Sequence, residues 1–133
     1  AERNLRRHGA CACWTLHCGS WWEPLRPWWG AFDLVLSNPP YIPSNLIHGL
    51  EPVVRDHEPH LALSGGADGL DSVRAVVKDA PRALSPGGWL LIEHHHDQSD
   101  AVVALMQRVG LSDVDAAPDL QGVMRFAMGR RPL

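Results

Sequence analysis

Hydrophobic residues along the chain alternate between helical spacing and short continuous runs, a pattern typical of an α/β protein. The helical spacing predicts one helix over 70–84, which ends before Pro86-Gly87-Gly88. A second helix is expected to begin with Asp97 or Ser99 as its cap and to end at Gly110. Short, mostly apolar runs predict strands at 32–37 and 89–93. Two further strand-like runs, 111–117 and 123–128, are expected to join as a hairpin through 118–122.

The beginning of the chain combines a helical pattern with three cysteines. Residues 1–8 predict the end of a helix that Gly9 terminates. The cysteine spacing C-x-C-x₄-C lacks the paired C-x₂-C knuckles of structural zinc sites, so a strand over 13–18 with reduced thiols is expected. The cysteines are Cys11, Cys13 and Cys18.

Two long connections flank the strand predicted at 32–37. The segment 14–29 holds five of the six tryptophans, and its prolines exclude a continuous helix, so it is expected to pack apolar side chains as a loop. The segment 44–69 is rich in Pro, Gly and His, and loops of this length in compact domains tend to be functional. Arg55 and Asp56 within it are expected to pair at the surface.

The stretch Asn38-Pro39-Pro40-Tyr41 carries the clearest chemistry, because it follows a predicted strand at the end where α/β sheets place ligands. Its two prolines stiffen the loop and leave the carbonyls of Asn38 and Pro39 free to point outward, beside the Asn38 side-chain oxygen. Two acceptors at one point suit a planar NH₂ group, and Tyr41 offers a face for stacking. An ordinary strand exit that stops at proline is the alternative interpretation.

Histidines gather where the strand at 89–93 ends, in Glu93-His94-His95-His96-Asp97. Imidazole and carboxylate groups are good metal ligands. Consecutive side chains of an extended chain point to opposite sides, so only His94 and His96 could share an ion. We therefore expect no metal site in this chain.

Composition sets broad limits on the class of protein. A chain of 133 residues can bury one core, and a net charge of −3 with a pI near 6.2 offers no basic surface for nucleic acid. The sequence contains neither a membrane-length apolar run nor a signal peptide. A cytoplasmic protein is the expectation.

Several of these segments resemble a known family. Asn38-Pro39-Pro40-Tyr41 after 32–35 looks like the signature of amino-directed S-adenosylmethionine-dependent methyltransferases. The segment 51–70, EPVVRDHEPHLALSGGADGL, resembles the protein-(glutamine-N5) methyltransferases that modify peptide chain release factors, the HemK/PrmC family. Segments 19–25 and 84–94 extend the match, which covers about Asn4 to Arg131.

The resemblance implies a Rossmann-like class I S-adenosylmethionine-dependent methyltransferase fold, truncated at the N-terminus and ending in an antiparallel hairpin. Residues 1–133 would be the C-terminal portion of a single methyltransferase catalytic domain, without its first two strands and its Gly-rich cofactor loop. The sequence has no Gly-x-Gly-x-Gly pattern. In the strand order 3-2-1-4-5-7-6 of this class, the strand at 32–37 would become an exposed apolar edge, and this chain alone is expected to be inactive.

The resemblance also implies a reaction, in which S-adenosyl-L-methionine methylates the side-chain amide of a glutamine in a release factor. No direct contact with nucleic acid or membrane is implied, and the oligomeric state is left open. The residues expected in catalysis are Asn38, Pro39 and Tyr41. The residues expected to bind the substrate are these three with Pro40 and Glu58, and those expected to bind the cofactor are Ser20, Trp21 and Asn38. Ser20 stands where many relatives carry an Asp near the adenine, and Arg125 matches an arginine of the family's last strand.

Two other classes remain open. A DNA or RNA adenine methyltransferase uses the same motif, with Tyr41 stacking on a flipped base. The acidic balance and the match over 58–70 argue against it. A non-enzymatic module, either structural or built on metal-binding Cys and His residues, is the third class.

Overall fold

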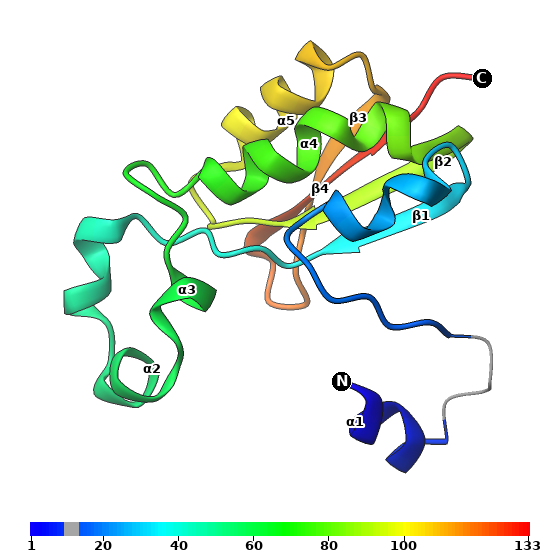
Figure 1. The fold of residues 1–133 in the computed structure, drawn as a ribbon. Helices are drawn as coiled ribbons and strands as arrows, with labels where there is room; N and C mark the ends of the chain where they lie inside the picture. Colours follow the sequence, from blue (N-terminus) through cyan, green and yellow to red (C-terminus); the bar gives the residue numbers. More distant parts are fainter. Residues whose placement is uncertain (10–13) are drawn as a thin grey trace.

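A four-stranded mixed sheet forms the centre of the computed structural model, which describes residues 1–9 and 14–133 (Figure 1). The strand order is β1-β2-β4-β3, in which β1 and β2 are parallel and the other two pairings are antiparallel. This order matches the 4-5-7-6 part of the order implied by the resemblance. The strands are β1 Phe32–Ser37, β2 Leu84–Glu93, β3 Ser112–Pro118 and β4 Met124–Arg130.

The strand β2 begins earlier than predicted. Helix α4 spans Asp71–Ala83, and β2 starts directly at Leu84, so Pro86-Gly87-Gly88 lies within the strand and not in a turn before it. Gly87 makes this possible, since its φ of +80° takes the chain through an irregularity in the pairing of β1 with β2. Phe32 pairs with Leu84 before the irregularity, and the pairing resumes at Leu34 and Trp89 after it. Arg131 spans the irregularity with backbone hydrogen bonds to both glycines.

Two amphipathic helices cover one face of the sheet. Helix α4 and helix α5, Ser99–Arg108, lie on the same side in Figure 1. Successive strand residues point to opposite faces, so Leu90 and Ile92 are fully buried beneath these helices. The core consists mainly of Val73, Val76, Val77, Ala80, Leu84, Leu90, Ile92, Val102, Met106 and Ala127.

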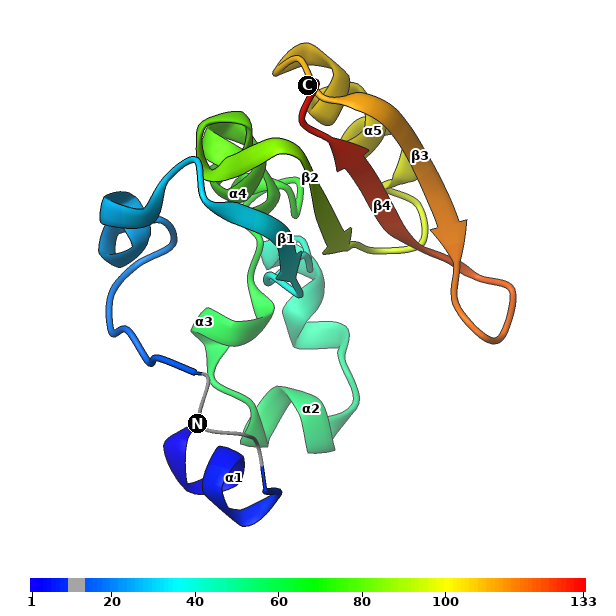
Figure 2. The ribbon, with the colours of Figure 1, turned by 90° about the vertical axis from the view of Figure 1, so that its right-hand side faces the viewer.

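The strand β1 lies at the edge of the sheet, opposite the β3–β4 hairpin (Figure 2). Leu34 and Leu36 point away from α4 and are 57% and 66% exposed. The exposed apolar edge implied by the resemblance is therefore present.

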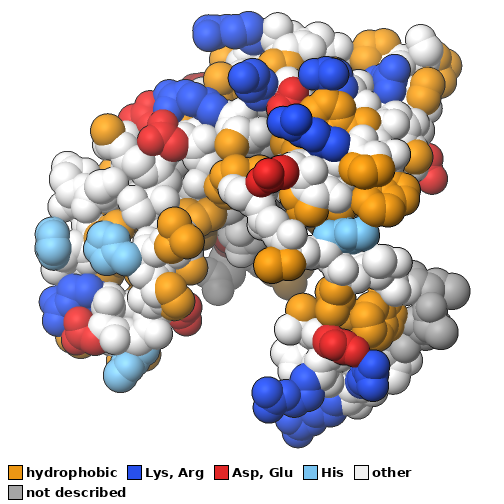
Figure 3. All heavy atoms as spheres, viewed as in Figure 1, with side chains coloured by type: hydrophobic (Ala, Val, Ile, Leu, Met, Phe, Trp, Pro, Cys, Tyr) orange, Lys and Arg blue, Asp and Glu red, His pale blue; other side chains and the backbone are white. Residues whose placement is uncertain are grey.

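Short helices occupy the connections predicted as loops. The tryptophan-rich segment contains the 3₁₀ helix η1, Glu23–Trp28, where Trp22 is buried but Trp21 and Trp28 are each 46% exposed. The expected burial of the tryptophans thus holds for only part of them. The long connection after β1 contains η2 Ser44–Gly49, α2 Pro52–His57 and α3 His60–Leu63. Histidine and charged side chains lie at several places on the surface that these three short helices form (Figure 3).

The beginning of the chain confirms one prediction and corrects another. Helix α1, Glu2–Arg7, is followed by Gly9 with a φ of +64°, as expected for a helix stop. In place of the strand predicted over 13–18, residues 14–18 have irregular backbone, because none of the strands in 1–9 and 14–133 pairs with them. Cys11 and Cys13 lie outside the described residues. No helix in 1–9 or 14–133 has the length and apolarity needed to cross a membrane.

Candidate functional site at the carboxyl ends of β1 and β2

The carboxyl ends of the two parallel strands bring separate segments together. Ser37, the last residue of β1, is paired with Ile92 of β2. The motif Asn38-Pro39-Pro40-Tyr41 therefore leaves the sheet beside Glu93, where β2 ends. This is the edge at which open α/β sheets bind ligands.

The motif presents polar groups that the fold does not use. Asn38 is exposed, whereas Pro39 is buried and anchors the loop. Among the turn, loop and side-chain hydrogen bonds of the described residues, none ends on the carbonyl of Asn38 or of Pro39. Acceptors next to a rigid, anchored ring are available to a ligand without rearrangement.

Tyr41 is held by a partner that sequence reasoning missed. Its hydroxyl donates a hydrogen bond to Oε1 of Glu93 over 3.0 Å. Burial raises the pKa of Tyr41, the Glu93 carboxylate raises it further, and Arg125 opposes the shift. The hydroxyl is thus a neutral donor near neutral pH. The parallel pairing of β1 and β2 is the signal that could have connected these residues, because it sets the two strand ends side by side.

Gln98 holds the backbone of the motif by a hydrogen bond, a role that the sequence did not indicate. Its Nε2 donates to the carbonyl of Tyr41 over 3.1 Å, and its Oε1 accepts the backbone N–H of His95 over 2.9 Å. Gln98 also takes the N-cap position of α5 without a side-chain capping bond. The predicted cap at Asp97 or Ser99 is therefore wrong, and the Asp97 carboxylate binds the His95 ring instead.

The 63–69 segment closes around the other side of the loop. The N–H of Ile42 donates to the Leu63 carbonyl over 3.1 Å, and the N–H of Gly65 donates back to Ile42 over 2.9 Å. A Cβ at Gly69 would lie 2.3 Å from the carbonyl oxygen of Tyr41. The glycine-rich segment thus approaches the motif backbone more closely than any side chain would permit.

Among the described residues, three cavities border the motif loop. One of about 160 Å³ is lined by residues 38–42 together with Ala62 and Leu63. Another of about 230 Å³ lies between Asn38, Glu93 and neighbouring strand residues. The third, about 340 Å³, is lined by Gly19, Ser20, Trp21, Pro40, Leu61, Ser64 and Ser72.

These cavities bring together most of the residues that the sequence singled out. Ser20 and Trp21 share the largest of the three with Pro40 of the motif. Glu58 lies apart, exposed where α2 ends, and the 44–69 connection lines the 160 Å³ cavity through α3. Arg55 and Asp56 form the expected surface pair, with Nε and Oδ1 2.8 Å apart.

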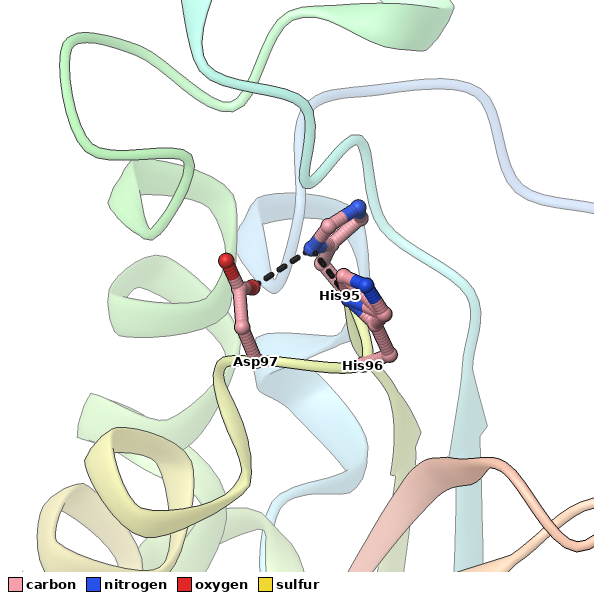
Figure 4. A group of neighbouring side chains, drawn as sticks. All are labelled: His95, His96 and Asp97. Carbon is pink, nitrogen blue, oxygen red and sulfur yellow. Dashed lines mark hydrogen bonds and ion pairs between the residues drawn. The ribbon is translucent and has the colours of Figure 1, made fainter.

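The histidine run folds differently from the extended chain assumed for it. Residues 94–97 turn directly after β2, so His94 is buried with Nδ1 2.7 Å from the His95 carbonyl oxygen. His95 and His96 meet instead, with their Nδ1 atoms 3.1 Å apart (Figure 4). The expectation that only His94 and His96 could share an ion is therefore wrong.

The fold defines the class of protein. A methyltransferase from Pyrococcus furiosus superimposes with a TM-score of 0.58 at 15% identity, covering 99% of this chain and 56% of that one. Together with the mixed sheet and its terminal hairpin, this confirms the expected class I methyltransferase fold.

Sequence comparison then finds named relatives of the chain, although no family model matches it. Release factor glutamine methyltransferases from Prochlorococcus marinus and Geobacter sulfurreducens are 55% and 46% identical over 99% and 98% of the chain. A third, from Thermosynechococcus vestitus, is 38% identical over 99%. The chain is therefore similar to release factor glutamine methyltransferases along nearly its whole length, and it spans about half the length of these curated relatives, covering 44% to 46% of each.

Proposed function

We propose that this chain supplies the amide-binding part of a release factor glutamine methyltransferase. The reaction moves a methyl group from S-adenosylmethionine to the side-chain amide nitrogen of a glutamine in a peptide chain release factor. The observation that carries the proposal is the rigid motif with open acceptors beside a cavity, in a chain 55% identical to a protein of that name.

An amide nitrogen is a poor nucleophile, because its lone pair is delocalised into the carbonyl. The Asn38 side-chain oxygen and the Pro39 carbonyl would accept its two hydrogens and orient the lone pair toward the methyl group. The same acceptors stabilise the positive charge that develops on the nitrogen during transfer. A general base is not needed until the methyl group has moved.

The 160 Å³ cavity suits a side-chain carboxamide. Its volume of about 160 Å³ is well above the space that a single ordered water needs, so a carboxamide group has room there. Tyr41 would stack on the flat amide while its bond to Glu93 fixes the ring. Glu58, exposed at the end of α2, would contact the release factor at the entrance and not the amide itself.

The cavity of about 340 Å³ fits part of the cofactor. Its lining offers an indole ring and three serine hydroxyls, which suit an adenine and its ribose. Ser20 and Trp21 would contact the cofactor there, and Asn38 would face its methyl group. When bound, S-adenosylmethionine supplies an electrophilic methyl on a sulfonium.

We also propose that residues 1–133 are the C-terminal portion of a single catalytic domain. The open edge of β1 and the greater length of the relatives support this. A sheet edge with exposed leucines is a site for strand addition. Residues 1–133 alone should then bind S-adenosylhomocysteine only weakly in titration calorimetry, and submicromolar binding would contradict this proposal.

The test of function is methyl transfer by the full-length protein from isotopically labelled S-adenosylmethionine. Mass spectrometry of the release factor should place the label on one glutamine side chain, and replacing that glutamine with leucine should abolish labelling. Transfer to adenine in DNA, with none to the release factor, would contradict the proposal.

A further inference from the structure

The geometry points to a metal site in the turn after β2, where His95, His96 and Asp97 would bind one divalent transition-metal ion. Their ligand atoms all lie within 4.8 Å of one another, and the three side chains converge in Figure 4. The family resemblance and the proposed methyl transfer assign no role to this cluster, and the inference stands independently of both.

The hydrogen bonds in the cluster show where an ion would lie. His95 Nδ1 is 2.5 Å from Asp97 Oδ1 and 3.1 Å from His96 Nδ1. The carboxylate of Asp97 can only accept, and two imidazole nitrogens can share a hydrogen only if one of them lacks it. A single proton on His95 Nδ1 satisfies both contacts, so the lone pairs of Asp97 and His96 are directed at one positive hydrogen. A metal ion at this point would replace that proton, which leaves to solvent, and all three atoms would become ligands.

The separations suit a small ion. With bonds of about 2.1 Å, tetrahedral ligands lie roughly 3.4 Å apart. The distance between His95 and His96 is already close to this, while Asp97 must move outward by somewhat less than 1 Å. Asp97 and His96 are exposed, so neither movement disturbs the core. Two imidazoles and one carboxylate favour zinc, cobalt, nickel or copper over magnesium or calcium, with water completing the shell.

The backbone of the turn is fixed before any ion arrives. Gln98 holds the N–H of His95, and the buried ring of His94 contacts the His95 carbonyl. The His95 ring also lies 6.4 Å from the ring of Tyr41, between centroids. An ion here would therefore add a rigid link within the turn that supports the motif loop.

Cobalt is the best probe, because its visible spectrum distinguishes nitrogen and oxygen ligands from the thiolates that the cysteines would supply. Titration of the full chain with Co²⁺ should show one ion bound per chain, without a thiolate charge-transfer band, and Zn²⁺ should displace it. Loss of a ligand in His96→Ala or Asp97→Asn should weaken binding by at least roughly tenfold.

The matched control is His57→Ala, which removes an exposed histidine from α2 and should leave the affinity unchanged. Circular dichroism of each variant shows whether the fold is retained, as expected for substitutions at exposed positions. Absence of Co²⁺ binding, a thiolate band, or equal affinities of His96→Ala and the parent would each overturn the proposal.

Discussion

Gly69→Ala should destabilise the chain through the motif loop, because Gly69 lies directly against the backbone of that loop at Tyr41. An added Cβ would lie 2.3 Å from the Tyr41 carbonyl oxygen and 2.6 Å from Nε2 of Gln98. It would therefore separate the two groups that hydrogen-bond to each other over 3.1 Å. Losing that bond costs about 1–3 kcal/mol when the carbonyl is left unsatisfied. The φ of +77° at Gly69 adds about 1 kcal/mol for any residue with a side chain.

Gly122→Ala separates these two costs. Gly122 has nearly the same φ, +81°, but an added Cβ there would meet nothing within 4 Å. Urea denaturation should therefore show a loss in the free energy of unfolding of about 1 kcal/mol for Gly122→Ala and about 2–4 kcal/mol for Gly69→Ala. Equal losses would refute the claim that Gly69 is required by its close contact with the motif loop.

Three further predictions concern other parts of the molecule. Tyr41 is the only tyrosine, so phenolate absorbance reports its pKa directly, and this pKa should lie above the ordinary value near 10. Glu93→Gln should lower the pKa of Tyr41, and an unshifted pKa in the parent protein would contradict the Glu93 contact. Because the pKa of Tyr41 is raised in the folded state, the contribution of Tyr41 to stability is complete below pH 10 and is lost as the pH rises through the folded-state pKa. Tyr41→Phe should remove this pH dependence of the free energy of unfolding. Trp22→Phe removes a buried 2.9 Å hydrogen bond to α4, so urea denaturation should show a loss of about 1–3 kcal/mol in the free energy of unfolding. Trp28 is half-exposed, and Trp28→Phe should lower the same free energy by less than about 0.5 kcal/mol. Leu36→Lys on the exposed edge should reduce self-association of the chain in analytical ultracentrifugation, and unchanged association would argue against an adhesive edge.

The parts of the fold that were predictable depend on local patterns. The apolar run at 32–37 and the two prolines after it mark a strand and its exit without knowledge of neighbours. The hairpin of β3 and β4 follows from two strand-like runs around a short turn. The predicted start of β2 was wrong because glycine permits two paths, and Gly87 continues the strand with a positive φ.

The parts that could not be predicted depend on where the chain travels in space. The turn after Glu93 brings His95, in place of the expected His94, next to His96. No pattern within the five consecutive polar residues 93–97 predicts that turn. Gln98 reaches a carbonyl 57 positions away, so only the packed structure reveals it as a clamp. The strand expected over 13–18 illustrates the same limit, since a strand forms only beside a partner.

The most direct test of the central claim is the kinetics of Asn38→Ala in the full-length protein with a release factor as substrate. Loss of one acceptor for the target NH₂ should cost about 1–3 kcal/mol in transition-state binding, roughly a 5- to 150-fold drop in kcat/KM. Asn45→Ala, at an exposed position in η2, is the matched control and should retain the parent value. Tyr41→Phe should be milder, because its stacking face survives. A kcat/KM for Asn38→Ala equal to that of Asn45→Ala would contradict the assignment of this motif as the glutamine amide site.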